Sequence, residues 1–325
     1  MNSLADLAAA IRRSERVLIC GHVSPDGDSL GSVLALGLTL EKLGKKVTMA
    51  GPDPVPAIYD FLPGAERFWV GEPPADKFDT LIVLDCSVPE RLGRGYQELL
   101  NSQLEIINID HHAGSLSFGT YRYVDHLSAS VGEIIFELLH LMKVSITMET
   151  AICLYTAIIT DTGSFQYDST TPDTHRRVAK LLEIGVPAAE ICTRLYEEKP
   201  KASILLLGQA LNTLSLSPCG KVCWITVSRE MLNKTGAKDE HTEGLVNFTR
   251  SIRGVEVGLL FHEVSDNKYK ISFRSKNLVD VNRLAALFGG GGHARAAGCV
   301  LQGSLNEIRE KVVSAAVLMA GGNKR

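Results

Sequence analysis

The first half of the chain carries histidine and aspartate residues in four separate segments. The first segment contains His22, Asp26 and Asp28, and the third is the Asp-His-His run at 110–112. Oxygen and imidazole donors without thiolates favour Mn²⁺, Mg²⁺ or Fe²⁺ over structural zinc. Six side chains are candidate metal ligands, enough for two ions if one carboxylate bridges them: His22, Asp26, Asp28, Asp85, His111 and Asp161.

Strand-like and helix-like patterns surround these segments. Three of these segments each follow an apolar run that is typical of a buried strand. The runs are 17–20, 78–84 and 104–109. A helix-like pattern follows the first segment over residues 30–43, and another leads into Asp161. Open α/β sheets bind ligands at the carboxyl ends of their strands. We therefore expect these side chains to converge on one rim of a sheet.

The first segment also has a purely structural interpretation. Asp28 could be the N-cap of the following helix, Asp26 an ordinary turn residue and His22 a buried histidine without a ligand. That segment alone does not decide between the two interpretations. The other segments favour metal binding, because so many acidic and imidazole groups on one rim would repel one another unless cations lay among them.

Two such cations have a recognised chemistry. At a separation of about 3.5 to 4 Å they lower the pKa of a water molecule and neutralise the charge that develops on a phosphoryl group. The protein then contributes mainly positioning and electrostatics. The predicted reaction is hydrolysis of a phosphate ester.

The order of the patterns predicts an α/β protein with two domains. Strands alternating with helices predict a mostly parallel sheet flanked by helices in a domain at 1–195. A helical linker is predicted at 196–214. A smaller α+β domain is predicted at 215–325, with helix patterns at 240–252 and 279–288 among its strands. We expect the active site in the cleft between the two domains.

A run of four glycines, 289–292, precedes His293 and Arg295 in the second domain. Consecutive glycines let backbone amides approach a ligand closely, and the adjacent histidine and arginine add donors for a phosphate. The alternative is a flexible hairpin tip. The positions of His293 and Arg295 favour anion binding.

Composition excludes several classes of protein. The net charge of −3 and the pI of about 6.3 provide no positive field for long duplex nucleic acid. Seven scattered cysteines without a Cys-x-x-Cys pair indicate a reducing compartment. The N-terminus lacks the apolar region of a signal peptide, and no apolar run reaches membrane-spanning length. We expect a cytoplasmic protein that does not bind membranes, and leave open whether it forms a homodimer.

The ordered motifs carry a family resemblance. The chain has His-x-x-x-Asp-x-Asp at 22–28, Asp85 at a strand end, Asp-His-His at 110–112 and Asp-Thr-Gly at 161–163, followed by the glycine run. This set resembles the DHH phosphoesterases that carry a DHH-associated C-terminal domain. Within them it is most similar to the bacterial group that combines oligoribonuclease (nanoRNase) and 3′-phosphoadenosine 5′-phosphate (pAp) phosphatase activities.

The resemblance implies a role for each candidate residue. His22 and Asp26 would hold one metal ion, the second would lie among Asp28, His111 and Asp161, and Asp85 would bridge both. Asp110 would orient an imidazole, and His112 would contact the scissile phosphate or assist the leaving oxygen, so that Asp85, Asp110 and His112 form the catalytic group. The implied substrate-binding residues lie in the second domain: Arg274, Ser275, Gly290, Gly291, Gly292, His293 and Arg295.

The activity implied by the resemblance is hydrolysis of RNA oligonucleotides of two to five residues to mononucleotides, and of pAp to AMP. Two divalent ions would be required, with Mn²⁺ favoured over Mg²⁺ or Fe²⁺. A phosphodiesterase for linear or cyclic dinucleotides, such as pApA or cyclic di-AMP, needs the same ligands and remains an alternative. A RecJ-like exonuclease on single-stranded DNA, a pyrophosphatase and a non-catalytic nucleotide-binding module are less favoured, the last because no candidate ligand is missing.

Overall fold

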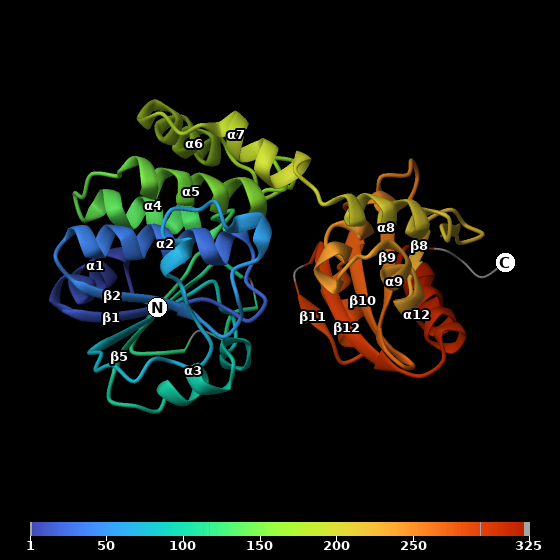
Figure 1. Cartoon of the computed structure of the whole chain (residues 1–325), viewed down its shortest axis with the longest axis horizontal. Helices are drawn as coiled ribbons and strands as arrows, with labels where there is room; N and C mark the ends of the chain where they lie inside the picture. The colour runs from blue at the N-terminus through green and yellow to red at the C-terminus, as the bar shows by residue number, and fades with distance from the viewer. Residues whose placement is uncertain (1, 113, 117, 293, 322–325) are drawn as a thin grey trace. The chain divides into compact units, whose positions relative to one another are not determined.

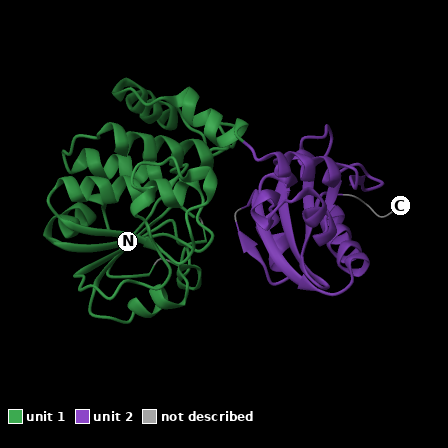
Figure 2. Cartoon of the chain, in the orientation of Figure 1, with its two compact units in different colours: residues 1–198 green, residues 199–325 purple. Residues whose placement is uncertain are grey.

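The computed structural model describes residues 2–112, 114–116, 118–292 and 294–321. They form two compact units, the first ending at Glu198 and the second beginning at Lys199 (Figure 2). Helix α8 (Lys201–Leu211) occupies most of the range predicted as a linker and belongs to the second unit. Its Leu206 lies in the same hydrophobic cluster as Ile225 of that unit.

Unit 1 contains a parallel sheet of six strands in the order β3-β2-β1-β4-β5-β6 (Figure 1). Because β1 pairs with both β2 and β4, the chain first adds strands on one side of β1 and then on the other. Ligands bind at such a switch point in open α/β sheets. The strands are β1 Arg16–Cys20, β2 Lys46–Gly51, β3 Trp69–Val70, β4 Thr80–Leu84, β5 Glu105–Asp110 and β6 Tyr121–Val124.

Helices cover both faces of this sheet, as the sequence predicts. Val17 and Ile19 of β1 lie in a large core with α2 and α4, whereas Leu18 and Cys20 face a smaller core that contains Tyr96 of α3. The helices of unit 1 are α1 Leu4–Arg13, α2 Gly27–Lys42, α3 Arg94–Leu99, α4 Val131–Leu141, α5 Met148–Asp161, α6 Pro172–Ile184 and α7 Ala188–Cys192. Short 3₁₀ turns lie at Ala57–Tyr59, Ala65–Arg67 and Pro89–Leu92, and a π turn at Thr193–Glu197.

Glycines let α2, α4 and α5 pack at very short range. A Cβ atom added to Gly31 of α2 would lie 2.5 Å from the carbonyl oxygen of Cys153 in α5. A Cβ atom on Gly132 of α4 would lie 2.6 Å from the Cβ of Ala157 in the same helix, α5. Real Cβ atoms do not approach so closely, so these positions require glycine. This packing brings the first turns of α2 and α4 and the last turn of α5 together.

Unit 2 contains a mixed sheet in the order β11-β12-β10-β9-β8-β7. Strands β8 and β9 are parallel, and the other neighbours are antiparallel. Helices α8, α9 and α10 pack on one face, and α11 and α12 on the other. The elements after α8 are β7 Ser215–Leu216, β8 Val222–Val227, α9 Arg229–Thr235, a 3₁₀ turn at Asp239–Thr242, α10 Leu245–Arg250, β9 Val257–Ser265, β10 Lys268–Ser275, α11 Val281–Ala286, β11 Gly291–Gly292, β12 Ala296–Gln302 and α12 Leu305–Met319.

The helix predicted at 240–252 is shorter and interrupted. A 3₁₀ turn ends at Thr242 and α10 begins at Leu245, with Gly244 between them at φ +77°. Glu243 leaves the helical conformation at ψ 134°, and a left-handed glycine after it cannot continue a right-handed helix, so the two turns stay separate. The pattern at 279–288 likewise forms the shorter helix α11. None of the helices that the structure describes has the length and apolarity needed to cross a lipid bilayer.

We expect Gly31→Ala to lower the free energy of unfolding by about 1–3 kcal/mol, because the added methyl group overpacks the α2–α5 contact. Gly208→Ala in α8 is the matched control, since no atom lies within 4 Å of its added Cβ. There the better helix propensity of alanine should stabilise the chain by about 0.5–1 kcal/mol. Calorimetric unfolding of both variants measures the difference, and stabilisation by Gly31→Ala would contradict this account of the packing.

Candidate metal centre

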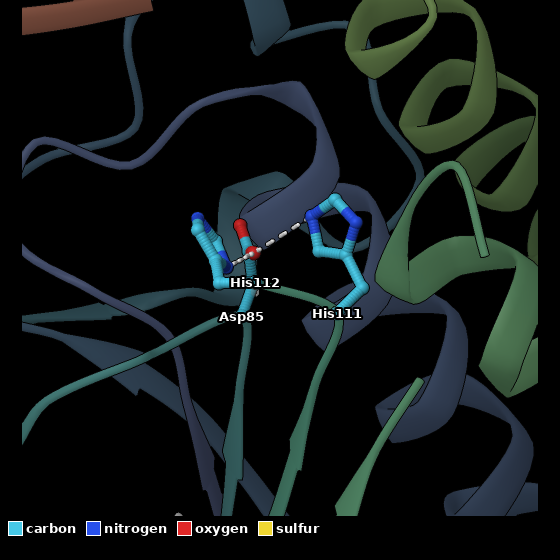
Figure 3. A group of neighbouring side chains, drawn as sticks. All are labelled: Asp85, His111 and His112. Carbon is cyan, nitrogen blue, oxygen red and sulfur yellow. Dashed lines mark ion pairs between the residues drawn. The ribbon is translucent and has the colours of Figure 1, made fainter. Parts of the chain in front are cut away.

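The carboxylate of Asp85 lies between two histidines at the carboxyl ends of the parallel strands. Asp85 follows β4 directly, and its Oδ2 lies 3.4 Å from His22 Nε2, in the loop after β1. Its Oδ1 lies 3.7 Å from Nε2 of His111, the residue after β5 (Figure 3). Oδ1 also lies 3.5 Å from Nδ1 of His112, and Asp85, His111 and His112 form a further set of possible donors (Figure 3). The two oxygens face different histidines, as a bridging ligand requires.

The first group of candidate ligands is His22, Asp26 and Asp85, whose donor atoms lie within 4.8 Å of one another. Asp26 Oδ2 lies 3.7 Å from His22 Nε2. Asp26 Oδ1 accepts hydrogen bonds from the backbone amides of Asp28 and Ser29, so Asp26 is the N-cap of α2. The capping interpretation of this segment therefore holds for Asp26 rather than Asp28, and the same carboxylate also faces the histidine.

The second group is Asp28, His111 and Asp161, again with donor atoms within 4.8 Å. His111 Nε2 lies 3.3 Å from Asp161 Oδ2 and 3.8 Å from Asp28 Oδ2. Asp28 is buried and accepts hydrogen bonds from the amides of Val131 (2.7 Å) and Gly132 (2.9 Å), the first residues of α4. The start of α2, the start of α4 and the end of α5 thus build this group.

Both candidate histidines contact a backbone carbonyl through Nδ1 and present Nε2 to the carboxylates. His22 Nδ1 lies 2.8 Å from the carbonyl oxygen of Val23, and His111 Nδ1 lies 3.2 Å from that of Ser128. A carbonyl can only accept a hydrogen bond, so Nδ1 must carry the proton in each contact. This is the tautomer that leaves the lone pair of Nε2 for a metal ion.

Negative charge dominates this rim. Burial would lower the pKa of His22 and His111, but neighbouring carboxylates outweigh it and raise the two pKa values to about 10 and about 9. Burial and repulsion from Asp85 and Asp161 raise the pKa of Asp28. Burial and the nearby carboxylates raise the pKa of Asp161 to about 7. Protons bound to these histidines and carboxyl groups thus compensate the negative charge of the cluster, and metal cations could compensate it instead.

The donor set fits divalent metal ions. Asp85 Oδ1 is buried and accepts no hydrogen bond from the residues that the structure describes. An orphaned buried carboxylate oxygen is costly unless a cation lies beside it. The two groups contain imidazole nitrogen and carboxylate oxygen without thiolate, which suits Mn²⁺, Mg²⁺ or Fe²⁺. The six side chains predicted from the sequence are therefore together in space and could hold metal.

Asp85 has an unusual backbone conformation, with φ at +56°. A residue with a Cβ atom rarely adopts this left-handed region, and aspartate and asparagine tolerate it better than most. The chain bends at Asp85 directly after β4, and the carboxylate lies between His22 and His111. Local strain of this kind is concentrated at functional sites.

Asp110 and His112 form a pair beside the two groups. Asp110 is fully buried, and its Oδ1 lies 2.6 Å from His112 Nδ1. Burial would raise the pKa of Asp110, but the hydrogen bond and charge of His112 outweigh it and lower the pKa to about 2. The carboxylate also accepts a hydrogen bond from the amide of His111. Asp110 therefore orients His112 through its ring and His111 through its backbone amide.

Arg91 is a residue of this region to which the sequence assigns no role. Its carbonyl oxygen accepts a hydrogen bond from the amide of Val23, which ties the 3₁₀ turn at Pro89–Leu92 to the loop after β1. Partial burial would raise the pKa of Asp26, but His22 and the positive charge of Arg91 hold it below its usual range. The Arg-Leu-Gly sequence at 91–93 is the local signal that could have marked this residue, but its position beside Asp26 required the fold.

In unit 2 the candidate substrate residues gather where β10 meets the β11–β12 hairpin. Arg274 and Ser275 end β10, and the Ser275 amide donates to the carbonyl of Arg295. The Arg295 side chain donates to the carbonyl of Val279 at 3.1 Å. His293 lies outside the residues that the structure describes. The other candidates are neighbours in this unit: Arg274, Ser275, Gly290, Gly291, Gly292 and Arg295.

The glycine run at 289–292 has a structural role in addition to the predicted anion binding. Gly291 and Gly292 form β11, which pairs with β12 in an antiparallel hairpin. A Cβ atom on Gly290 would lie 2.2 Å from the carbonyl oxygen of Gly298, and one on Gly292 2.5 Å from that of Ala296. Close packing within the hairpin therefore requires glycine at both positions. The hairpin alternative explains the run in part, and anion binding stays a prediction.

We expect Asp85→Asn to weaken binding of both metal ions by at least about 100-fold, because one oxygen of the shared carboxylate becomes an amide nitrogen that cannot coordinate. Asparagine tolerates the left-handed backbone, whereas Asp85→Ala would add strain of about 1–2 kcal/mol. Calorimetric titration with Mn²⁺ measures the loss. Asp79→Asn, at the amino end of the same strand, is the control and should bind both ions as before; unchanged binding by Asp85→Asn would exclude a shared ligand.

Comparison with known proteins assigns the two units to known domains. The family model described as "DHH family, N-terminal domain" matches residues 16–158. The family model of the DHHA1 domain matches residues 221–317. A Thermus thermophilus protein named bifunctional oligoribonuclease and PAP phosphatase NrnA is 34% identical over 92% of this chain and 88% of its own length. A Bacillus subtilis protein of the same name is 28% identical over 90% of this chain and 91% of its own.

A solved structure has the same fold over almost the whole chain. The exopolyphosphatase-related protein from Bacteroides fragilis superposes with a TM-score of 0.89 at 27% identity, covering 98% of this chain and 95% of that one. The resemblance seen in the motifs is thus confirmed by similarity along both units. With its two matched domains and its NrnA relatives, the chain belongs to the DHH family of phosphoesterases.

Proposed function

We propose that this protein is a Mn²⁺-dependent phosphoesterase that hydrolyses short RNA oligonucleotides to mononucleotides and converts pAp to AMP. The observation that carries the proposal is the position of Asp85 between the two ligand groups, with Oδ2 facing His22 of its own group and Oδ1 facing His111 of the other. It is supported by the Thermus relative, which is named for both activities and aligns over nearly the whole chain. The proposal includes the choice of Mn²⁺ over Mg²⁺ and Fe²⁺, which nitrogen and oxygen donors alone do not separate.

In the proposed site, His22 and Asp26 hold one ion, Asp28, His111 and Asp161 hold the other, and Asp85 contacts both. The ions supply Lewis-acid stabilisation of the phosphoryl oxygens and lower the pKa of the attacking water. The side chains hold the geometry in advance. The N-cap bonds of Asp26 and the α4 amides on Asp28 keep these carboxylates in place without substrate.

His112 is the proposed proton donor to the leaving oxygen. Asp110 contacts its Nδ1, so Nε2 is the nitrogen that we assign to the substrate side. This contact with the buried Asp110 carboxylate fixes the orientation of the ring, which a general acid needs. Asp110 is thus a positioning residue for this proton transfer.

Unit 2 is proposed to bind the substrate's nucleoside and its second phosphate. Arg274 and Arg295 provide charged donors near the glycine hairpin, beside Ser275, whose buried hydroxyl donates to the carbonyl of Ala294. Arginine suits phosphate because its guanidinium presents a planar array of N–H groups. A small number of such contacts suits a short anionic substrate. A net charge of −3 adds little general attraction for a long strand.

A phosphodiesterase for linear or cyclic dinucleotides needs the same metal chemistry and is the second candidate. Turnover with Mn²⁺ separates the two: we expect fast cleavage of a two-residue RNA, a five-residue RNA and pAp, and little cleavage of long single-stranded DNA or cyclic di-AMP. Chelation should abolish all turnover. Preference for cyclic di-AMP would replace the proposal by the second candidate, and inactivity on all substrates would refute both.

Arg295→Ala should raise KM for pAp and short RNA with a smaller change in kcat, because the arginine is proposed to contact phosphate in the ground state as well as the transition state. Arg283→Ala in the neighbouring helix α11 is the control, since its side chain is 82% exposed and pairs with Asp280. Steady-state kinetics of both variants provides the comparison. A loss of kcat alone, with KM unchanged, would argue against phosphate binding by Arg295.

A further inference from the structure

Nδ1 of His111 contacts a backbone carbonyl from another part of the chain. This nitrogen lies 3.2 Å from the oxygen of Ser128, which belongs to a turn after β6 rather than to the strand that delivers the histidine. His22 differs, because its Nδ1 contacts the carbonyl of the next residue, Val23. The two candidate ligand groups are therefore oriented by separate parts of the chain.

Asp125 builds the turn that places the Ser128 carbonyl. Its Oδ1 accepts a hydrogen bond from the Leu127 amide at 3.0 Å, and its Oδ2 accepts one from Ser128 Oγ at 2.7 Å. The carbonyl of Asp125 also accepts from the Ser128 amide at 3.2 Å. Aspartate stabilises tight turns through such bonds to residues that follow it.

The same turn is attached to the strand that delivers His111. The Asp125 amide donates to the carbonyl oxygen of Asp110 at 3.1 Å, and Asp110 directly precedes His111. A closed path therefore runs from the strand end through Asp125 to Ser128 and back to the imidazole. A path of this kind holds the ring from both sides, through its backbone and through Nδ1.

Hydrogen bonds rather than apolar packing hold this turn. Leu127, at its tip, is 84% exposed and contributes no buried surface, whereas Ser128 is 8% exposed. Without the Asp125 carboxylate, the Ser128 hydroxyl and the Leu127 amide lose their only acceptors among the described residues. We expect the turn to relax and the Ser128 carbonyl to move away from His111.

We propose that Asp125 is a positioning residue that selects the Nε2-coordinating form of His111, and so sets the metal affinity of the Asp28–His111–Asp161 group alone. The inference rests on the proposed two-metal function. Outer partners of metal-binding histidines fix the tautomer and ring orientation, and their loss costs about 10–100-fold in metal affinity. The His22–Asp26–Asp85 group has its own carbonyl partner and should be unaffected.

The test is calorimetric titration of the full chain with Mn²⁺. Wild type should show two binding events. Asp125→Ala should weaken one event by about 10–100-fold and leave the other within about twofold. Asp125→Asn keeps an acceptor for Leu127 and a polar partner for Ser128, so it should recover most of the affinity. Asp60→Ala, which removes an exposed carboxylate from unit 1, controls for the change in charge.

A second readout reports the tautomer directly. In Mg²⁺-loaded protein, long-range ¹H–¹⁵N spectra, assigned with a His111→Gln variant, should show Nδ1 protonated in wild type and a loss of that state in Asp125→Ala. Two normal binding events in Asp125→Ala would overturn the inference and leave the two-metal function intact. Equal weakening of both events would show general loosening and would also overturn it. Absence of both events in wild type would instead refute the proposed metal function.

Discussion

Repulsion between buried carboxylates is the constraint on which this structure depends. Asp28 and Asp85 lie on one rim with Asp161, and burial together with the neighbouring carboxylates raises the pKa of both Asp28 and Asp161. Such a cluster persists only if backbone amides, imidazoles and cations compensate it. The chain supplies the first two, through the α4 amides on Asp28 and the two histidines that face Asp85. The cations would be the divalent metal ions that the donor set fits.

The fold can be understood as a means of meeting that constraint. Parallel strands place β1, β4 and β5 side by side, so three loops reach one rim. Glycine contacts between α2, α4 and α5 then bring helix ends to the same place. Helix N-termini stabilise negative charge, which suits the position of Asp28 against α4. The backbone of Asp85, in a conformation that aspartate tolerates, directs the shared carboxylate between the two groups.

Much of this could be predicted from the sequence, for a physical reason. Strands buried on both faces are continuous apolar runs, so the strands that lead to Asp85 and Asp110 could be predicted. The order of the ligand types along the chain indicated the site. The partners of the ligands were not visible. Asp28 contacts amides 103 and 104 positions away, and His111 contacts a carbonyl 17 positions away, where no pattern of residue types marks the contact. The glycine run was ambiguous because hairpin packing and anion binding both require glycine.

The central claim is that two metal ions share Asp85. Anomalous diffraction at the manganese edge, from crystals grown with Mn²⁺, tests it most directly. The account predicts two peaks about 3.5–4 Å apart, one beside His22 and Asp26 and the other among Asp28, His111 and Asp161, with Asp85 in contact with both. A single peak, or two peaks without Asp85 between them, would contradict the account.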